Sequence, residues 1–226
     1  ANGYLGIRGS FEEGRLVARA GTFINGFYET EPINYAESAY GFARKRQKML
    51  NITDGTSIEL YVGEDPLDLA TGRVLQHRRV LDLREGTLRR ELEWESPSGV
   101  RIRLSSLRLV SFTQEHLALI DWRVTLLSHP VPVTVVSSLI GRSKPQADYD
   151  DPRLGPSLAK DALILRDRRI DGVYGSLRHV TRNSRFSLVA MMANYLRTDC
   201  HYECIPEESQ RDVWHRYEIS PQQGKE

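Results

Sequence analysis

Apolar and polar residues alternate along most of the chain, a pattern typical of half-buried antiparallel strands. In the segment 100–104, Val100, Ile102 and Leu104 share one face, and the two residues between them are arginines. The same alternation recurs at 58–62, 118–126, 131–135 and 213–219. We therefore expect a chain built mainly of short strands.

Short turn sequences separate these segments at Asp54-Gly55, Ser96–Gly99, His129-Pro130 and Asp171-Gly172. The last pair lies between two apolar runs and predicts a β-hairpin. No helical period is sustained, and the best helix candidate, 35–50, contains two breaks in the phase of the period and Gly41. Many closely spaced strands without intervening helices predict an all-β fold, a large antiparallel β-sandwich.

Two stretches differ from this pattern. The first 50 residues are rich in glycine and aromatic residues and are expected to form an irregular packed loop. Residues 142–157 carry three prolines and read as a polar loop. No repeat or break in composition divides the chain, so residues 1–226 are expected to form one domain. The chain begins without methionine and stops just after a strand-like stretch, so we expect a fragment truncated at both ends.

The balance of positive and negative charge argues against some classes of binding partner. The 226 residues contain 31 Lys and Arg and 30 Asp and Glu, a formal net charge of +1. This balance gives no long-range field to attract nucleic acid or anionic membranes. The longest apolar run, Leu188–Ala193, is far shorter than the roughly 20 residues that span a bilayer. We expect neither nucleic acid nor a membrane as partner.

The two cysteines, Cys200 and Cys204, are four residues apart. On a strand they would lie roughly 13 Å apart, too far for a disulfide, so reduced thiols and a cytoplasmic location are expected. Together with His201 they offer three metal ligands of mixed facing and no fourth. We predict no metal there.

Asp148, Asp150 and Asp151 could hold a hard cation, although a solvated acidic loop is the commoner outcome. Gly3, Gly6 and Gly9 lack the Gly-x-Gly-x-x-Gly spacing of a dinucleotide loop. They fit a turn that lets the backbone approach another surface closely. No metal or cofactor is expected.

Paired acids occur at 12/13, 29/31, 64/65 and 93/95. A glycosidase needs two carboxyl groups across a cleft. Most of these acids alternate with apolar residues, so we expect them on outer, solvated faces. The six histidines are dispersed and show no triad order, which favours structural roles. One alternative stays open, because mutarotase-like sandwiches use a histidine and a carboxylate to open sugars.

The opening run Asn2-Gly3-Tyr4-Leu5-Gly6-Ile7-Arg8-Gly9, followed by Glu12-Glu13, resembles the N-terminal domain of glycoside hydrolase family 65. Further pieces follow in the family's order at 21–29, 39–43, 51–54, 81–88, 108–111 and 116–118. The resemblance covers roughly residues 1–125. It implies a super-sandwich of the galactose-mutarotase type, in agreement with the alternation described above.

The resemblance also implies a parent enzyme that phosphorolyses or hydrolyses an α-linked glucose disaccharide with inversion. In this family a glutamate of a following (α/α)₆ barrel is the general acid, and inorganic phosphate is the co-substrate of the phosphorylases. No barrel element lies in these 226 residues, so no catalytic residue can be assigned. The fragment is expected to be inactive, with its own missing catalytic domain as partner and a homodimer as a further expectation.

The first 50 residues are the face expected to meet the missing barrel, where they could edge the sugar pocket or the dimer interface. The residues predicted for that role are Asn2, Gly3, Arg8, Phe27, Tyr28 and Glu29. The alternative is that they only pack loop onto sheet. Two other functions remain open, a stand-alone carbohydrate-binding or oligomerisation module and a mutarotase-like enzyme.

Overall fold

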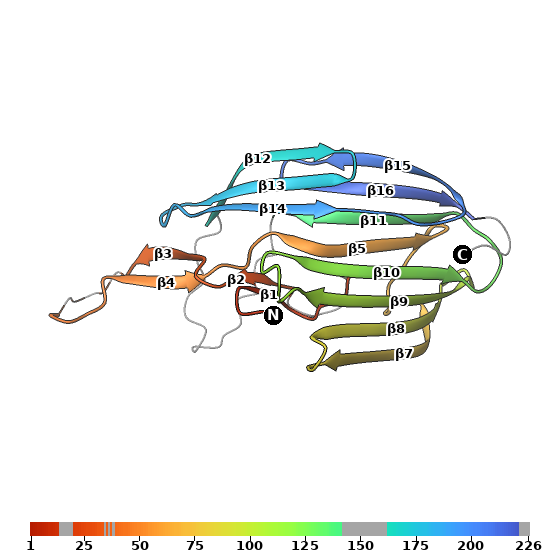
Figure 1. Ribbon diagram of the computed structural model, residues 1–226, viewed down its shortest axis with the longest axis horizontal. Helices are drawn as coiled ribbons and strands as arrows, with labels where there is room; N and C mark the ends of the chain where they lie inside the picture. Colours follow the sequence, from red (N-terminus) through yellow and green to blue (C-terminus); the bar gives the residue numbers. More distant parts are fainter. Residues whose placement is uncertain (14–19, 34, 36, 38, 142–161, 222–226) are drawn as a thin grey trace.

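The computed structural model describes residues 1–13, 20–33, 35, 37, 39–141 and 162–221. Within these residues the fold is all-β, with sixteen strands, no helix and only antiparallel pairing (Figure 1). The all-β prediction is confirmed. The long strands run roughly along the long axis of the molecule (Figure 1).

A four-stranded sheet and a five-stranded sheet form the main sandwich. The first has the order β10 (Ala118–Leu126), β9 (Arg101–Val110), β8 (Thr87–Glu95) and β7 (Arg73–Asp82). The second has the order β15 (His201–Glu208), β16 (Asp212–Ser220), β11 (Val133–Ile140), β5 (Asp54–Val62) and β6 (Asp65–Pro66). All five alternating segments found in the sequence fall on these strands, although Val100 precedes β9 and Val131 precedes β11.

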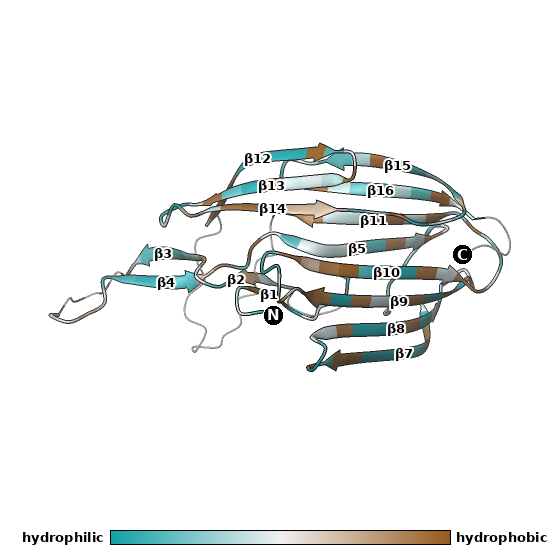
Figure 2. Ribbon diagram, viewed as in Figure 1, coloured by the Kyte–Doolittle hydropathy of each residue, from teal (hydrophilic) through white to brown (hydrophobic). Residues whose placement is uncertain are grey.

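The main core lies between these two sheets. Trp94 and Ile102 from one sheet, and Leu60 and Val62 from the other, are almost completely buried. Along β9 and β10 apolar and polar residues alternate (Figure 2), because one face packs on this core while the other meets solvent. The alternation in the sequence therefore arises because each strand buries one face in the sandwich.

A three-stranded sheet packs on the five-stranded sheet, at the end that holds Leu139 and Val213. Its order is β12 (Leu163–Asp171), β13 (Tyr174–Thr181) and β14 (Ser187–Ala193). Leu177 packs there on Leu139 and Val213 in a second core. The predicted hairpin at Asp171-Gly172 is confirmed, since Asp171 pairs with Tyr174 and Gly172 has a φ of 54°.

The first 50 residues are more ordered than expected. They contain two small antiparallel pairs, β1 (Leu5–Ile7) with β2 (Thr22–Ile24), and β3 (Tyr28–Pro32) with β4 (Lys45–Met49). The prediction of an irregular loop was wrong for these four strands, and the part of the helix candidate 35–50 that is regular is the strand β4. The β3–β4 hairpin projects from one end of the molecule (Figure 1).

One predicted turn was also misplaced. Asp54-Gly55 begins β5 rather than ending a strand. The side chain of Asp54 accepts a hydrogen bond from the backbone N–H of Thr56 at 2.8 Å, so this acid starts the strand instead of turning the chain.

Candidate functional site

Asn2 and Gly3 form the turn at the start of the described chain. Asn2 Oδ1 accepts a hydrogen bond from the backbone N–H of Leu5 at 2.7 Å, and Asn2 Nδ2 donates to the carbonyl oxygen of Ser111 at 2.6 Å. Gly3 has a φ of 91°, which favours glycine. Asn2 thus ties the first turn to the loop between β9 and β10.

Arg8 follows β1 and is exposed. Its guanidinium carbon lies 5.2 Å from the centre of the Phe23 ring, a cation–π contact. Its carbonyl oxygen accepts a hydrogen bond from Arg108 at 3.2 Å. The side chain is therefore held in place on the surface by β2.

A buried arginine–glutamate network joins the N-terminal segment (residues 1–13) to the four-stranded sheet. It consists of Glu12, Glu13, Arg90 and Arg108. Arg90 binds the Glu13 carboxylate through both terminal nitrogens, at 2.6 and 2.7 Å. Arg108 donates to Glu12 at 2.6 Å, and all four side chains are at most 5% exposed. The expectation that Glu12 and Glu13 face solvent was wrong.

The network explains how residues 8–13 close one end of the sandwich. Arg90 lies on the same inner face of β8 as Leu92 and Trp94. Unlike those two residues, it is not part of the apolar core. Phe11 covers it, with its ring centre 4.4 Å from the Arg90 guanidinium carbon. The carbonyl oxygen of Glu12 accepts a hydrogen bond from the N–H of Ile58 on β5 at 3.0 Å. The segment therefore bridges both sheets.

Glu29 forms the centre of what we call the hairpin clamp, made of Glu29, Asn183 and Ser184. Its carboxylate, on a residue only 1% exposed, accepts hydrogen bonds from the backbone N–H groups of Asn183 at 3.0 Å and Ser184 at 2.8 Å. In return Ser184 Oγ donates to the carbonyl oxygen of Tyr28 at 2.7 Å. The base of the β3–β4 hairpin is thus fixed to the turn between β13 and β14.

The electrostatics of Glu29 suit this anchoring role. Burial raises the pKa of Glu29, but hydrogen bonds from Asn183, Thr30 and Ser184 outweigh it, so the pKa lies below its ordinary value. A general acid needs a raised pKa so that it keeps its proton at neutral pH. Glu29 therefore holds the chain together as a carboxylate and is unsuited to proton donation.

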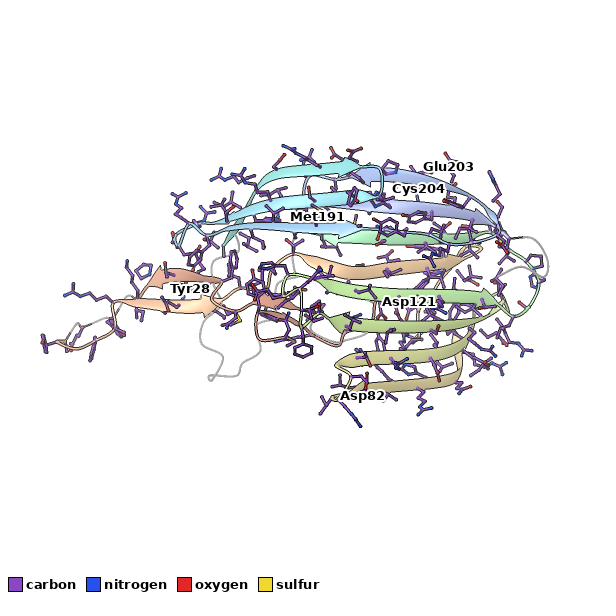
Figure 3. The ribbon with its side chains drawn as sticks, viewed as in Figure 1. Tyr28, Asp82, Asp121, Met191, Glu203 and Cys204 are labelled. Atoms are coloured by element: carbon purple, nitrogen blue, oxygen red, sulfur yellow. The ribbon has the colours of Figure 1, made fainter. Side chains whose placement is uncertain are left out.

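Phe27 and Tyr28 pack on the same turn. Phe27 is buried in a small core with Leu188, and the Tyr28 and Phe186 rings meet edge to face at 5.1 Å. Tyr28 lies on β3, at the root of the projecting hairpin (Figure 3). Of the six residues predicted for an interface, Phe27, Tyr28 and Glu29 gather here, whereas Asn2, Gly3 and Arg8 lie along the N-terminal segment.

The far end of the hairpin carries three exposed aromatic residues that the sequence prediction did not single out. We call Tyr35, Tyr40 and Phe42 the hairpin tip. Tyr40 is completely exposed and Phe42 is 49% exposed, while the rings of Tyr35 and Phe42 lie 4.9 Å apart. Exposed aromatic residues that cluster in this way mark surfaces that meet a partner or ligand.

The other candidates from the sequence are less informative. Cys200 is buried and Cys204 is exposed on β15 (Figure 3), and both are free thiols. Within the described residues no group of three His, Cys, Asp or Glu side chains could hold a metal ion. Asp148, Asp150 and Asp151 lie outside the described residues.

Two of the dispersed histidines, His179 and His215, are buried. His215 Nε2 lies 2.9 Å from the carbonyl oxygen of Gly172, and His215 Nδ1 lies 3.0 Å from the Asn194 amide nitrogen. Burial lowers the pKa of both histidines. Each imidazole is therefore neutral at neutral pH. The contacts of His215 are those of a structural side chain.

Comparison with protein-family models decides the family. The model described as glycosyl hydrolase family 65, N-terminal domain, matches residues 1–226. The chain belongs to this family. The match covers the whole chain, beyond the first 125 residues on which the sequence resemblance rested.

The relatives of this family 65 domain include proteins named as phosphorylases and others named only as uncharacterized glycosyl hydrolases of Mycobacterium. It is 37% identical over 207 residues to an alpha,alpha-trehalose phosphorylase of Thermoanaerobacter brockii, covering 90% of this chain and 27% of that protein. It is 25% identical over 206 residues to a kojibiose phosphorylase of Caldanaerobacter subterraneus, covering 90% of this chain and 25% of the relative. The domain therefore spans about a quarter of the length of these curated relatives.

A solved structure supports the fold. A candidate kojibiose phosphorylase from the human microbiome superposes with a TM-score of 0.76 at 21% identity, covering 97% of this domain and 27% of that chain. At this identity the likeness establishes the β-sandwich fold. Separately, the described part of the domain holds no helix long and apolar enough to cross a membrane.

Proposed function

We propose that this domain is the non-catalytic N-terminal module of an inverting α-glucoside phosphorylase, with inorganic phosphate as co-substrate of the whole enzyme. The names and lengths of the relatives support this proposal, since the domain corresponds to about a quarter of proteins named as disaccharide phosphorylases. The substrate class is an α-linked glucose disaccharide. A cytoplasmic location and a homodimeric enzyme belong to the same proposal.

The buried acids support the non-catalytic part of the proposal. Glu12 and Glu13 are ion-paired with arginines, and Glu29 is bound by backbone N–H groups. None of these three buried carboxylates is free to protonate a glycosidic oxygen. Catalysis is therefore assigned to a domain outside these 226 residues.

The observation that carries the architectural role is the projecting hairpin. Its base is fixed by the hairpin clamp, and its tip presents Tyr40 and Phe42 away from the sandwich. A rigidly based arm with an exposed aromatic tip suits insertion against a second surface. We assign that surface to the catalytic domain, close enough to edge the sugar pocket. Exposed Arg8 adds a positive charge along the N-terminal segment.

The test uses the longer protein that contains this chain. Trehalose, kojibiose, maltose and nigerose are each supplied with and without phosphate, and glucose and glucose 1-phosphate are followed. Phosphate-dependent formation of β-glucose 1-phosphate is expected. Glucose release that ignores phosphate would assign a hydrolase, and no turnover of any disaccharide would overturn the proposal.

Arg8→Ala in the same protein tests the role of the N-terminal segment. We expect a higher KM for the disaccharide or weaker assembly, because a positively charged surface side chain of this segment is lost. If both KM and assembly are unchanged, Arg8 does not edge the pocket or an interface.

The competing reading, a stand-alone carbohydrate-binding module, predicts that this chain binds the disaccharides by itself. A mutarotase-like enzyme would instead accelerate the interconversion of glucose anomers. Isothermal titration and polarimetry on the 226-residue chain separate both from the proposed module, which is expected to give neither signal.

A further inference from the structure

A cavity of about 520 Å³ lies where the three-stranded sheet meets the five-stranded sheet. We call it the arginine pocket, because four of the residues that line it are arginines. These are Arg166, Arg168, Arg182 and Arg211. Its volume falls within the roughly 300–1,000 Å³ of ordinary small-molecule sites.

A β-bulge places Arg166 at this cavity. Leu165 pairs with His179 and Asp167 pairs with Arg178, so Arg166 is the extra residue without a partner on β13. Bulges re-aim a side chain that regular pairing would have sent elsewhere. Among the described residues that line the cavity Asp167 is the one acid, and its carboxylate is bound by Arg169 at 3.0 Å.

The opposite wall is the turn between β15 and β16. A Cβ atom on Gly141 would lie 2.3 Å from the carbonyl oxygen of Arg211, so only glycine allows this close approach. The backbone N–H of Gly141 donates to Asp212 at 2.9 Å and fixes the turn. Arg211 thus lines the same pocket as the bulge residue Arg166.

His179 contributes a buried imidazole to the same lining. It is 2% exposed, and its Nδ1 lies 3.4 Å from the Thr53 hydroxyl. Its Nε2 lies 3.3 Å from the position of a Cβ on Gly141, on the pocket side. Burial lowers the pKa of His179, so the ring is neutral at neutral pH. With Nδ1 next to the Thr53 hydroxyl, Nε2 is the ring nitrogen left on the side of Gly141.

The arginines around the pocket differ in whether they are ion-paired. Arg168 is paired with Glu208 at 3.3 Å. Among the described residues, the side chains of Arg166 and Arg211 have no ion-pair partner. Guanidinium groups bind the oxygens of phosphates in a fork of parallel hydrogen bonds, which suits them to this class of ligand.

We propose that the arginine pocket binds a phosphoryl group, either as inorganic phosphate or as the phosphate of a small phosphomonoester such as a sugar phosphate. The site requires only residues of this domain and is independent of the proposed phosphorylase activity. The volume leaves room for a sugar beside the phosphate. The arginines supply the donors that such a ligand needs.

The test titrates the 226-residue chain with inorganic phosphate, glucose 1-phosphate and glucose by calorimetry, with ionic strength held constant by NaCl. Phosphate-bearing ligands are expected to bind and glucose is expected to give no signal. Tighter binding of glucose 1-phosphate than of phosphate identifies a phosphomonoester as the ligand, and the reverse order identifies phosphate itself. No binding of either phosphate-bearing ligand would overturn the proposal.

The double variant Arg166→Gln/Arg211→Gln is expected to weaken binding by about tenfold or more. Arg78→Gln/Arg89→Gln is the matched control, because it removes the same charge from exposed positions on β7 and β8. Equal weakening by both pairs would show a non-specific charge effect and overturn the site. Shifts of the Gly141 amide signal in ¹⁵N NMR of the unsubstituted chain give a second readout. An unmoved Gly141 signal during binding would place the ligand elsewhere.

Discussion

Glu29 accepts a 2.8 Å hydrogen bond from the backbone N–H of Ser184, a residue 155 positions later in the chain. This contact joins the hairpin near the start of the domain to the turn between β13 and β14. It converts a short, two-stranded hairpin, which is marginally stable alone, into a fixed arm.

Replacing Glu29 by glutamine tests the hairpin clamp. The amide retains one acceptor oxygen but loses the charge that three backbone N–H groups bind, so we expect a loss of about 1–3 kcal/mol in the free energy of unfolding. Urea denaturation measures it. Glu93→Gln, which disturbs only the surface pair with Arg103, is the control and is expected to cost less than about 1 kcal/mol. Equal costs would show that the clamp contributes nothing special.

The pH dependence of stability should have two stages. The folded pKa values of His179 and His215 lie below the ordinary 6.5, so the unfolded chain takes up protons first as the pH falls. Their contribution is complete above pH 6.5 and is lost below it. Glu29 likewise stabilises the fold above its ordinary 4.5, and this contribution is lost as the pH falls through its lowered folded pKa.

Variants separate the two stages. His179→Gln should flatten the change in unfolding free energy just below pH 6.5, and Glu29→Gln should flatten the change below pH 4.5. Chemical denaturation at a series of pH values measures both. A profile left unaltered by either substitution would contradict the assignment.

The arginine–glutamate network should be strongly coupled. Arg90→Met leaves the buried Glu13 carboxylate without its bidentate partner, and we expect a loss of about 3–5 kcal/mol. The double variant Glu13→Gln/Arg90→Met should cost less than the sum of the single changes. Arg103→Met on the surface is the control, with less than about 1 kcal/mol expected. Strict additivity in the cycle would refute the coupling.

The hairpin tip should matter for function and little for stability. Tyr40→Ser/Phe42→Ser removes exposed rings, so the unfolding free energy of the chain should change by less than about 0.5 kcal/mol. In the longer protein the same variant should raise the KM for the disaccharide or weaken contact between domains. Leu83→Ser, 85% exposed in the turn after β7, is the matched control. Identical kinetics for both variants would remove the tip from the proposed interface.

The sequence predicts the long strands well because their alternation reflects burial on one face. It fails in the first 50 residues, where the strands have only three to five residues and are too short to show the period. Their existence depends on distant partners, such as Ser184 for the β3–β4 hairpin. Such contacts leave no local pattern.

The burial of Glu12 and Glu13 could have been predicted from β8, the strand that carries their partner Arg90. Glu12 and Glu13 look like ordinary surface residues in their own segment. Arg90, however, is in phase with Leu92 and Trp94, so its position on the apolar face predicts a buried charge that needs a carboxylate. The arginine pocket had no comparable signal, since it depends on the register shift at Arg166.

The most direct test of the proposed non-catalytic role compares two proteins in one assay. The 226-residue chain and the longer protein that contains it are each given the four disaccharides with phosphate, and glucose 1-phosphate is measured. The account predicts product from the longer protein and none from the chain at any concentration. Phosphate-dependent product from the 226-residue chain alone would contradict it.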